Sequence, residues 1–275
     1  MRHRFKAPAG GRLDKLIADN TRLSRKRARG LIKRGGVRVD GRVEKREGFR
    51  TPEGALVELR TTAVSTDVKI DDVWRGDGLL VVMKPSGLPS QPTRSGEQRH
   101  LYGALMAREG YVGLHHRLDT PASGLVLLTV DRRLNKPISE ALKEGAIERR
   151  YRVAVLGDPG NDGVWNQPIE GKKAKTTWRR LATDSHASIL DVTLSTGRTH
   201  QIRRHAAEAG FPVLGDRRHG GAAGRAWGRL ALHAWRLSFT HPATNAPVIV
   251  TAPLPDDLAD LFDQIGFTEE SAPTC

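Results

Sequence analysis

The sequence is poor in cysteine and in long apolar runs, and each shortage excludes a class of protein. Its one cysteine, Cys275, is the last of 275 residues. Neither an internal disulfide framework nor a cysteine metal site is therefore possible within one chain. No apolar run approaches the roughly 18 residues of a membrane-spanning helix. The first residues, MRHRFKAPAGG, lack the apolar centre of a signal peptide. These absences predict a cytoplasmic protein that has no membrane partner.

Acidic residues are scarce at one end of the chain. The net charge is +14. Residues 1–60 hold 18 Lys or Arg against 7 Asp or Glu, a net of +11, whereas the other 215 residues hold 27 against 24, a net of +3. Such a localised basic segment is typical of a polyanion binder, although it could also be a solubilising head. A membrane-surface helix would need bulky apolar anchors, which this segment largely lacks.

The first 60 residues divide into a predicted flexible basic tail, residues 1–10, and a compact unit, residues 11–60. Apolar residues at helical spacing predict a first helix that ends near Asn20: Leu13, Leu16 and Ile17. Ser24 is placed to cap a second helix. Gly35 and Gly36 follow that helix and are typical of a helix end. The second helix carries a basic cluster: Arg25, Lys26, Arg29 and Lys33.

Asp40-Gly41, between alternating valines, predicts a β-hairpin, and a further strand follows TPEG. The segments RLDKLIADN, LSRKRARGLIKRGGVRVDGR and TPEGALVEL, in this order, resemble the S-four RNA-binding domain over residues 11–60. The resemblance implies that the basic cluster lies against RNA phosphates. The alternative is a small α+β module with a solvated charged face.

Residues 61–72 are predicted to form a linker, and residues 73–275 a second unit rich in short β runs. These runs are 78–84, 124–130, 149–157, 187–194, 231–241 and 247–253. Helical patterns lie between or after them, at 101–109, 134–145, 199–210 and 256–266. Because strands and helices mix without a regular βαβ alternation, we predict an α+β fold with a mixed, mostly antiparallel sheet.

The segment HHRLDTPASGLVLLTV has the richest chemistry. Asp119 follows Arg117 and precedes a proline turn and an apolar strand. A carboxylate beside an arginine at the mouth of a buried strand can serve as a catalytic group. A turn aspartate before proline is also common without any function.

The segment STGRTHQIRRHAAEAGFPVLGD places basic residues around a predicted helix. Thr199 is placed to cap this helix, which ends at Gly210. Arg198, at the strand–helix junction, is placed to reach a carboxylate on a neighbouring strand, and Arg203 and Arg204 would project toward a polyanion. A capped surface helix with basic residues is the alternative.

Three other features are less specific. Tyr151 lies in the strand ERRYRVAVLG, where most tyrosines are simply packed. Lys84-Pro85 begins a segment that, taken alone, is only a turn. His200 and His205 are five residues apart rather than the four of a zinc-binding helix, so we predict no metal site.

Together, HRLD with a following Ser-Gly, the tyrosine strand, TGRTHQIR and GFPVLGD resemble the RluA-type pseudouridine synthases over residues 73–255. LHAWRLSFTHP, near the C-terminal end, is a further family-like segment. The chain departs from the usual pattern at positions that flank the site: Pro121, Ala122 and Gln91. These departures concern loop geometry and the fit of the substrate rather than the reaction.

The resemblance implies catalytic roles for Asp119, for Arg198 as its ion-pair partner, and for Tyr151, which packs on the target uracil and is the candidate for removing the proton from carbon 5. Arg117 would occupy the space of the flipped-out base. Further substrate contacts are predicted at other positions: His116, His200, Arg203, Arg25, Lys26, Arg29 and Lys33. The predicted enzyme is an isomerase that needs no cofactor, because the reaction involves no redox change and no net hydrolysis.

The predicted partner is RNA. Ribosomal RNA is favoured, with the large subunit first, and transfer RNA is possible. The alternatives are an RsuA-type synthase, a non-catalytic RNA-binding or ribosome-assembly protein and, least supported, a hydrolase with Asp119 as nucleophile. A monomer is expected because no exposed heptad pattern appears. Whether Asp119 attacks the anomeric carbon or deprotonates the sugar stays open.

Overall fold

The computed structural model describes residues 2–268 except for residues 22, 34, 61–67, 93–98, 223, 225 and 226. The chain divides into two compact units. The first comprises residues 1–68 and 92–103, and the second comprises residues 69–91 and 104–275. Most of the predicted linker, residues 61–72, lies outside the described residues, so its bounds stay a prediction.

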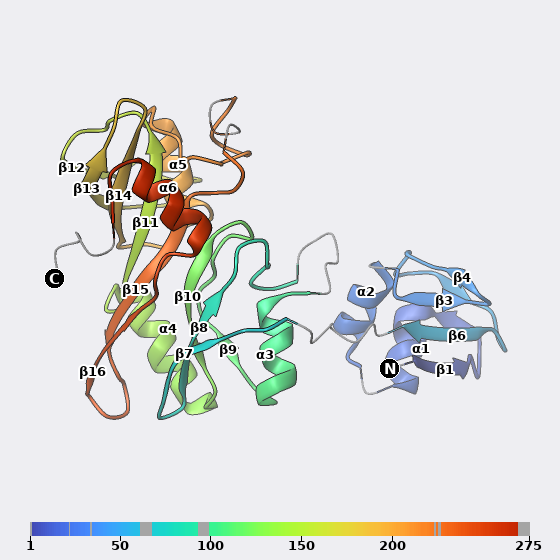
Figure 1. The fold of residues 1–275 in the computed structure, drawn as a ribbon. Helices are drawn as coiled ribbons and strands as arrows, with labels where there is room; N and C mark the ends of the chain where they lie inside the picture. Colours follow the sequence, from blue (N-terminus) through green and yellow to red (C-terminus); the bar gives the residue numbers. More distant parts are fainter. Residues whose placement is uncertain are drawn as a thin grey trace. The chain divides into compact units, whose positions relative to one another are not determined.

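The first unit combines two short helices with small sheets (Figure 1). Its elements are β1 (Arg2–Lys6), β2 (Gly11–Arg12), α1 (Leu13–Asn20), α2 (Arg25–Lys33), β3 (Val37–Val39), β4 (Arg42–Val43), β5 (Arg50–Thr51) and β6 (Leu56–Arg60). One sheet has the order β1-β6-β3-β4, and β2 pairs with β5. The expectation that residues 1–10 are a flexible tail was wrong for β1, which pairs antiparallel with β6. Phe5 anchors this strand by packing against the core.

The local predictions for the first unit are otherwise confirmed. The Ser24 hydroxyl accepts a hydrogen bond from the backbone N–H of Arg27 at 3.3 Å, at the start of α2. Asp40 and Gly41 both have positive φ, 49° and 78°, as a two-residue hairpin turn requires. The core is formed by apolar residues from both helices and the main sheet: Leu13, Ile17, Ala28, Ile32, Val37, Val39, Ala55, Val57 and Leu59.

The second unit is built on one large sheet. Its strands are β7 (Asp72–Gly76), β8 (Leu79–Lys84), β9 (Gly113–Leu114), β10 (Ser123–Thr129), β11 (Glu148–Leu156), β12 (Asp162–Trp165), β13 (Thr176–Thr183), β14 (Ala187–Leu194), β15 (Leu232–Thr240) and β16 (Pro247–Thr251). The order is β12-β13-β14-β11-β15-β10-β8-β7, with β16 beside β15 and β9 beside β10. Among the described strands only β10 and β15 pair in parallel, which confirms the mostly antiparallel α+β fold.

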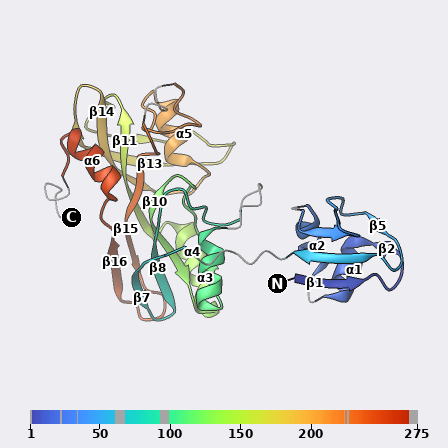
Figure 2. The ribbon, with the colours of Figure 1, turned by 45° about the vertical axis from the view of Figure 1, so that its right-hand side comes forward.

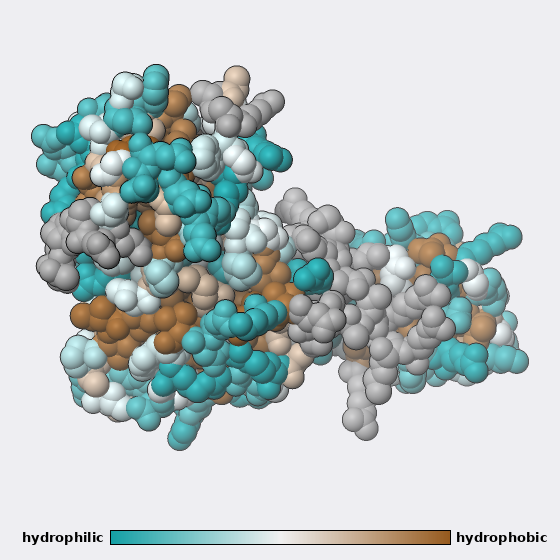
Figure 3. Space-filling model, viewed as in Figure 1, coloured by the Kyte–Doolittle hydropathy of each residue, from teal (hydrophilic) through white to brown (hydrophobic). Residues whose placement is uncertain are grey.

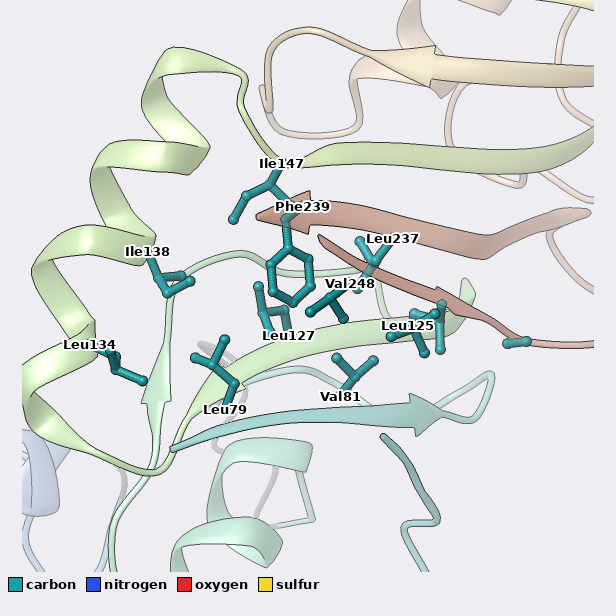
Figure 4. Packing of buried hydrophobic residues seen from close by; sticks show 12 residues of the cluster. Leu79, Val81, Leu125, Leu127, Leu134, Ile138, Ile147, Leu237, Phe239 and Val248 are labelled. Carbon is teal, nitrogen blue, oxygen red and sulfur yellow. The ribbon is translucent and has the colours of Figure 1, made fainter. Parts of the chain in front are cut away.

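Helices cover both faces of this sheet. They are α3 (Leu101–Glu109), the 3₁₀ turn η1 (Arg132–Leu134), α4 (Asn135–Glu144), α5 (Gln201–Glu208) and α6 (Asp256–Gln264). In Figure 2, α6 lies on one side of β11 and β14, and α5 lies on the other. The strand register agrees. Ile189 packs with α6, whereas Leu194 pairs with Thr176, which contacts α5. Figure 4 shows the packing of α4, where Ile138 meets Leu127 and Phe239.

Gly124 makes the single parallel pairing possible. Its φ is +120°, and a Cβ there would lie 2.3 Å from the carbonyl oxygen of Ala234, so no other residue fits without moving β15. The Ser123 hydroxyl shares a hydrogen bond of 2.9 Å with His233 and accepts another from Arg229 at 2.8 Å. The Ser-Gly pair therefore fixes the start of β10, next to the loop that carries Asp119.

Two further results concern the surface and the strands that were not predicted. No helix among the described residues is long and apolar enough to cross a bilayer. Large hydrophobic side chains in that part of the chain are mostly buried, and the exposed ones are Val43, Val73, Val164 and Ile249. Figure 3 shows brown hydrophobic areas between the teal and white parts of the surface. Strands β7, β12 and β13 were missed because polar and charged residues interrupt their apolar pattern.

Candidate active site

Asp119 lies in a turn, residues 118–121, that leads into β10, and we call it the Asp119 turn. Its own carbonyl accepts a hydrogen bond from the backbone N–H of Ala122 at 3.1 Å. Its side chain is 21% exposed. The carboxylate is thus held at the edge of the buried strand but remains open to a substrate.

Residues 84–90, here called the clamp segment, hold the Asp119 turn through hydrogen bonds to its backbone carbonyls. The Gly87 N–H donates to the Thr120 carbonyl at 2.8 Å, the Ser86 hydroxyl to that of Pro121 at 2.8 Å, and the Ser90 hydroxyl to that of Leu118 at 2.8 Å. The sequence indicated only a turn here. Its role as a clamp depends on contacts some 30 residues away, which spacing does not show.

Lys84 is the centre of this clamp. Its side chain is fully buried. Its ammonium donates to the carbonyls of Pro85 and Leu88, both at 2.8 Å, and to that of Thr120 at 3.3 Å. Burial lowers the pKa of Lys84 from 10.5 to about 7, while the nearby charge of Asp119 acts in the opposite direction. Lys84 therefore joins the clamp segment to the Asp119 turn through carbonyl groups that would otherwise be unsatisfied.

Arg203 of α5, and not Arg198, is the ion-pair partner of Asp119. Its Nη1 donates to Asp119 Oδ2 at 2.8 Å, and its side chain is 5% exposed. Arg198 is exposed, and its Nε donates to the backbone carbonyl of Lys173 at 3.0 Å. The predicted Arg198–Asp119 pair is therefore wrong, and so is the expectation that Arg203 projects outward. Arg204 does reach the surface side, where it pairs with Glu170 at 2.9 Å.

Asp216 holds Arg203 in place. Its two carboxylate oxygens accept from Nε and Nη2 of Arg203 at 2.8 and 2.7 Å. The backbone N–H groups of Arg218 and His219 donate to the same carboxylate. Burial opposes the charge, but these hydrogen bonds outweigh it and lower the pKa of Asp216 to about 2. The GFPVLGD motif thus supplies a buried anion that orients the arginine beside Asp119.

A histidine pair completes this side of the site. His200 Nε2 lies 3.8 Å from Asp119 Oδ1, the oxygen to which Arg203 does not donate. His200 Nδ1 and His219 Nε2 share a hydrogen bond of 2.8 Å. Burial lowers the pKa of both rings, so both are neutral at neutral pH. His200 has a φ of 55° and precedes α5, so the predicted cap at Thr199 was wrong and the helix begins at Gln201.

Tyr151 faces the same site from β11. Its ring is buried, and burial raises the pKa of its phenol; the charge of Arg149 opposes this rise, and the charge of Asp119 adds to it. His116 accepts a hydrogen bond from the Leu127 N–H at 2.9 Å. Burial, together with the charge of Arg149, lowers the pKa of His116 to about 3. Tyr151 and His116 are therefore both neutral at physiological pH, and their predicted substrate contacts stay predictions.

The predicted RNA-contacting residues divide into exposed and paired groups. Arg117 is exposed and forms no ion pair with the described part of the chain. In the first unit, Arg25 and Arg29 both bind the fully buried Asp14, at 3.1 and 2.7 Å. Lys33 pairs with Glu47 at 2.5 Å. With Lys26, these residues line one surface hollow, so the structure brings the predicted basic cluster of α2 together.

The site offers carboxylate, imidazole and phenol groups. The described residues contain no group of three or more His, Cys, Asp or Glu placed to hold a metal ion. The arrangement presents one carboxylate oxygen, Asp119 Oδ1, to a substrate, while Arg203 fixes the other. A group held in this way can attack an electrophilic carbon or remove a proton. Sequence reasoning missed the roles of Arg203, Asp216, Lys84 and His219.

Comparison with known proteins identifies the family. Residues 78–208 match the model described as RNA pseudouridylate synthase, and residues 11–57 match the S4 domain, the S-four domain named above. The ribosomal large subunit pseudouridine synthase D of Xylella fastidiosa is 31% identical over 293 residues, covering 92% of this chain and 88% of that protein. The protein of the same name from Neisseria meningitidis serogroup A is 32% identical over 296 residues, covering 92% and 78%.

Solved structures agree on the fold. Human RNA Pseudouridylate Synthase Domain Containing 4 matches 70% of this chain and 92% of its own with a TM-score of 0.59 at 19% identity. Human RNA Pseudouridylate Synthase Domain Containing 1 matches 70% and 85%, also at 0.59, with 24% identity. The chain belongs to the RNA pseudouridylate synthase family, isomerases that convert uridine in RNA to pseudouridine, and its N-terminal part is an S4 domain.

Proposed function

We propose that this synthase acts on uridines of large-subunit ribosomal RNA and that Asp119 is its catalytic carboxylate. The observation that carries the assignment is the Asp119–Arg203–Asp216 chain, which fixes one oxygen of Asp119 and leaves the other open. The choice of RNA rests on the names of the relatives, which are ribosomal large subunit pseudouridine synthases. Transfer RNA is the second candidate substrate.

The reaction requires a base that has left the RNA helix, which costs a few kcal/mol. Arg117 is exposed beside Asp119 and is suited to occupy the vacated space, because its planar cation stacks on bases and binds phosphate. Tyr151 offers an aromatic surface beside Asp119 for the flipped uracil. Since its pKa is raised, Tyr151 is a neutral phenol. It would therefore pack on the base and relay the carbon 5 proton rather than act as a strong base.

Asp119 Oδ1 then acts at the sugar. It either forms a bond to the anomeric carbon or takes a proton from the neighbouring carbon, and in both cases the bond between uracil nitrogen 1 and the sugar breaks. The base turns and rejoins through carbon 5, which finally loses its proton. Reactant and product are isomers, so the overall change requires no oxidant, reductant or water. The role of Arg203 is to orient the carboxylate through a charge-assisted hydrogen bond.

The first unit would contribute affinity. Its basic residues on α2 provide a cationic surface near a hollow, and contacts to phosphate give binding that weakens as salt rises. A protein that acts on ribosomal RNA in this way is expected to be cytoplasmic and, as predicted above, monomeric.

The test is pseudouridine mapping on unmodified ribosomal RNA and transfer RNA incubated with the purified protein, with Asp119→Asn in parallel. We expect new pseudouridines in large-subunit RNA with the wild type only, while the variant binds RNA within a few-fold of the wild type. Activity retained by Asp119→Asn would refute the catalytic assignment. Modification confined to transfer RNA would refute the substrate assignment.

A further inference from the structure

Arg149 is a buried arginine for which the described part of the chain supplies no hydrogen-bond or ion-pair partner. Its side chain belongs to a residue that is 6% exposed, and its Nε is buried without any hydrogen-bond partner. Across the described residues, its guanidinium makes no hydrogen bond or ion pair, in contrast to Arg203, which has two carboxylate partners. A buried charge that is left unpaired costs several kcal/mol and calls for an explanation.

The position of Arg149 points to the active site. On β11 it precedes Tyr151 by two residues, so both side chains lie on the same face of the strand. Its charge acts on Tyr151 and on His116, which are both neutral groups of the site. A Cβ at Gly197 would lie 3.1 Å from Arg149 Nη1, so the guanidinium reaches the loop that enters α5. Neither Tyr151 nor His116 supplies it with a counter-charge.

We propose that Arg149 is a catalytic residue that stabilises the uracil anion released when the glycosidic bond breaks. When that bond breaks, its electron pair stays on nitrogen 1, and the negative charge spreads over the ring and its two carbonyl oxygens. A cation already in place and partly shielded from water stabilises such a charge as it develops, without any reorganisation. The inference rests on the proposed role of Asp119, whose oxygen acts on the sugar while Arg149 acts on the departing base.

A backbone phosphate is the other anion that Arg149 could bind. Phosphates lie on the outside of RNA, and the exposed arginines Arg117 and Arg198 are already placed for them. A uracil that has entered the site beside Tyr151 is the anion that a buried guanidinium can reach. The two roles differ in what they change: a phosphate contact sets RNA affinity, whereas a contact with the uracil anion sets the rate of the chemical step.

The experiment compares Arg149→Met and Arg149→Lys with the wild-type full chain. Arg133→Met, which removes an exposed arginine whose ion pair in the described part of the chain is with Asp131, controls for the loss of one positive charge. Single-turnover rates on saturating RNA, the Kd for RNA and the thermal midpoint are measured for each. For Arg149→Met we expect a rate about 100-fold lower, an unchanged Kd, and a midpoint equal to or above that of the wild type, because an unpaired buried charge has been removed. Arg149→Lys should regain part of the rate.

The nature of the leaving group supplies a second readout. Fluorine at carbon 5 stabilises the uracil anion by itself, so consumption of 5-fluorouridine RNA should depend less on Arg149. We expect the defect of Arg149→Met to shrink from about 100-fold on uridine to about 10-fold or less on 5-fluorouridine. An equal defect on both substrates, a weaker Kd at an unchanged rate, or a lowered thermal midpoint would each overturn the proposal. Asp119→Asn tests the underlying assignment separately, because activity retained by that variant contradicts the catalytic carboxylate whatever Arg149 does.

Discussion

Replacing Arg203 by methionine tests the central geometry of the site. The substitution removes the cation that binds Asp216 through two hydrogen bonds and Asp119 through a third. Asp216 is 1% exposed, so its charge would remain in the interior with only backbone N–H donors. Breaking a buried pair from one side costs about 3–5 kcal/mol. At about 2–4 °C per kcal/mol for a unit of this size, the thermal midpoint should fall by about 6–20 °C.

The stability that the Arg203–Asp216 ion pair contributes depends on pH. Because the folded-state pKa of Asp216 is about 2, below its ordinary 3.8, the stability from this ion pair is present above pH 4 and is lost as pH falls toward 2. The difference in unfolding free energy between wild type and Arg203→Met should therefore be largest near neutrality and shrink as pH falls toward 2. Urea unfolding followed by tryptophan fluorescence measures it.

Activity should separate from stability in a double variant. Asp216→Asn in the Arg203→Met background removes the uncompensated charge, so it should restore part of the thermal midpoint. It cannot restore the hydrogen bond to Asp119, so the single-turnover rate should stay about 10²–10³-fold low. Arg198→Met is the matched control, because it also replaces an arginine but removes a hydrogen bond to the backbone carbonyl of Lys173 rather than one to Asp119. If Arg198→Met abolished turnover and Arg203→Met did not, the ion-pair geometry described here would be refuted.

Three other substitutions test the supporting structure. Asp14→Ala should destabilise the first unit by about 1–3 kcal/mol. Burial raises the pKa of Asp14, but hydrogen bonds from arginines outweigh it and hold this pKa well below its usual range, so the loss of stability should fade as pH falls below about 4. NMR of the α1 amides during urea unfolding measures it. Between about pH 7 and pH 10 the folded protein binds fewer protons than the unfolded chain, because Lys84 is neutral only when folded, so the free energy of unfolding of the wild type should rise with pH by up to about 1.4 kcal/mol per pH unit. Lys84→Met should remove this rise. If the difference in thermal midpoint between wild type and Lys84→Met did not change with pH, the prediction would be contradicted. Gly124→Ala should disrupt the pairing of β10 with β15, since its Cβ would lie 2.3 Å from the Ala234 carbonyl, whereas Gly171→Ala, with positive φ but no close neighbour, should lose only about 1–3 kcal/mol in thermal unfolding.

Local patterns predicted the elements whose apolar residues are regular. Helix α3 and strand β10 lie within one residue of the predicted bounds because each has a single dense apolar segment. Strand β13 was missed because TTWRRLAT mixes arginine and threonine with apolar residues, and its pairing with β14 supplies the hydrogen bonds that its composition does not indicate. Strand β1 was missed for a similar reason, since four of its five residues are basic, and Phe5 is the residue that packs against the core.

Arg203, and not the predicted Arg198, is the ion-pair partner of Asp119 for a structural reason that residue spacing could not reveal. The left-handed conformation of His200, with φ of 55°, delays the start of α5 to Gln201. Arg198 therefore stays in the exposed loop, while Arg203 falls in the first turn on the buried face, next to Ile202. The arginine-rich motif predicts that one of its arginines binds the carboxylate of Asp119. The conformation of His200, which lies between Arg198 and Arg203, decides which arginine it is.

This choice of partner separates orientation of the catalytic carboxylate from binding of RNA. Asp119 receives its hydrogen bond from an arginine that Asp216 already holds in the interior, so none of the exposed arginines is needed to orient it. Arg117 and Arg198 therefore remain free to meet phosphate, and they can respond to salt and to RNA shape without moving the carboxylate. Had Arg198 been the partner, RNA binding at the surface would have competed with Asp119 for the same cation. The buried pair avoids that competition, and for this reason we expect RNA affinity and the rate of the chemical step to vary independently when surface and interior arginines are substituted.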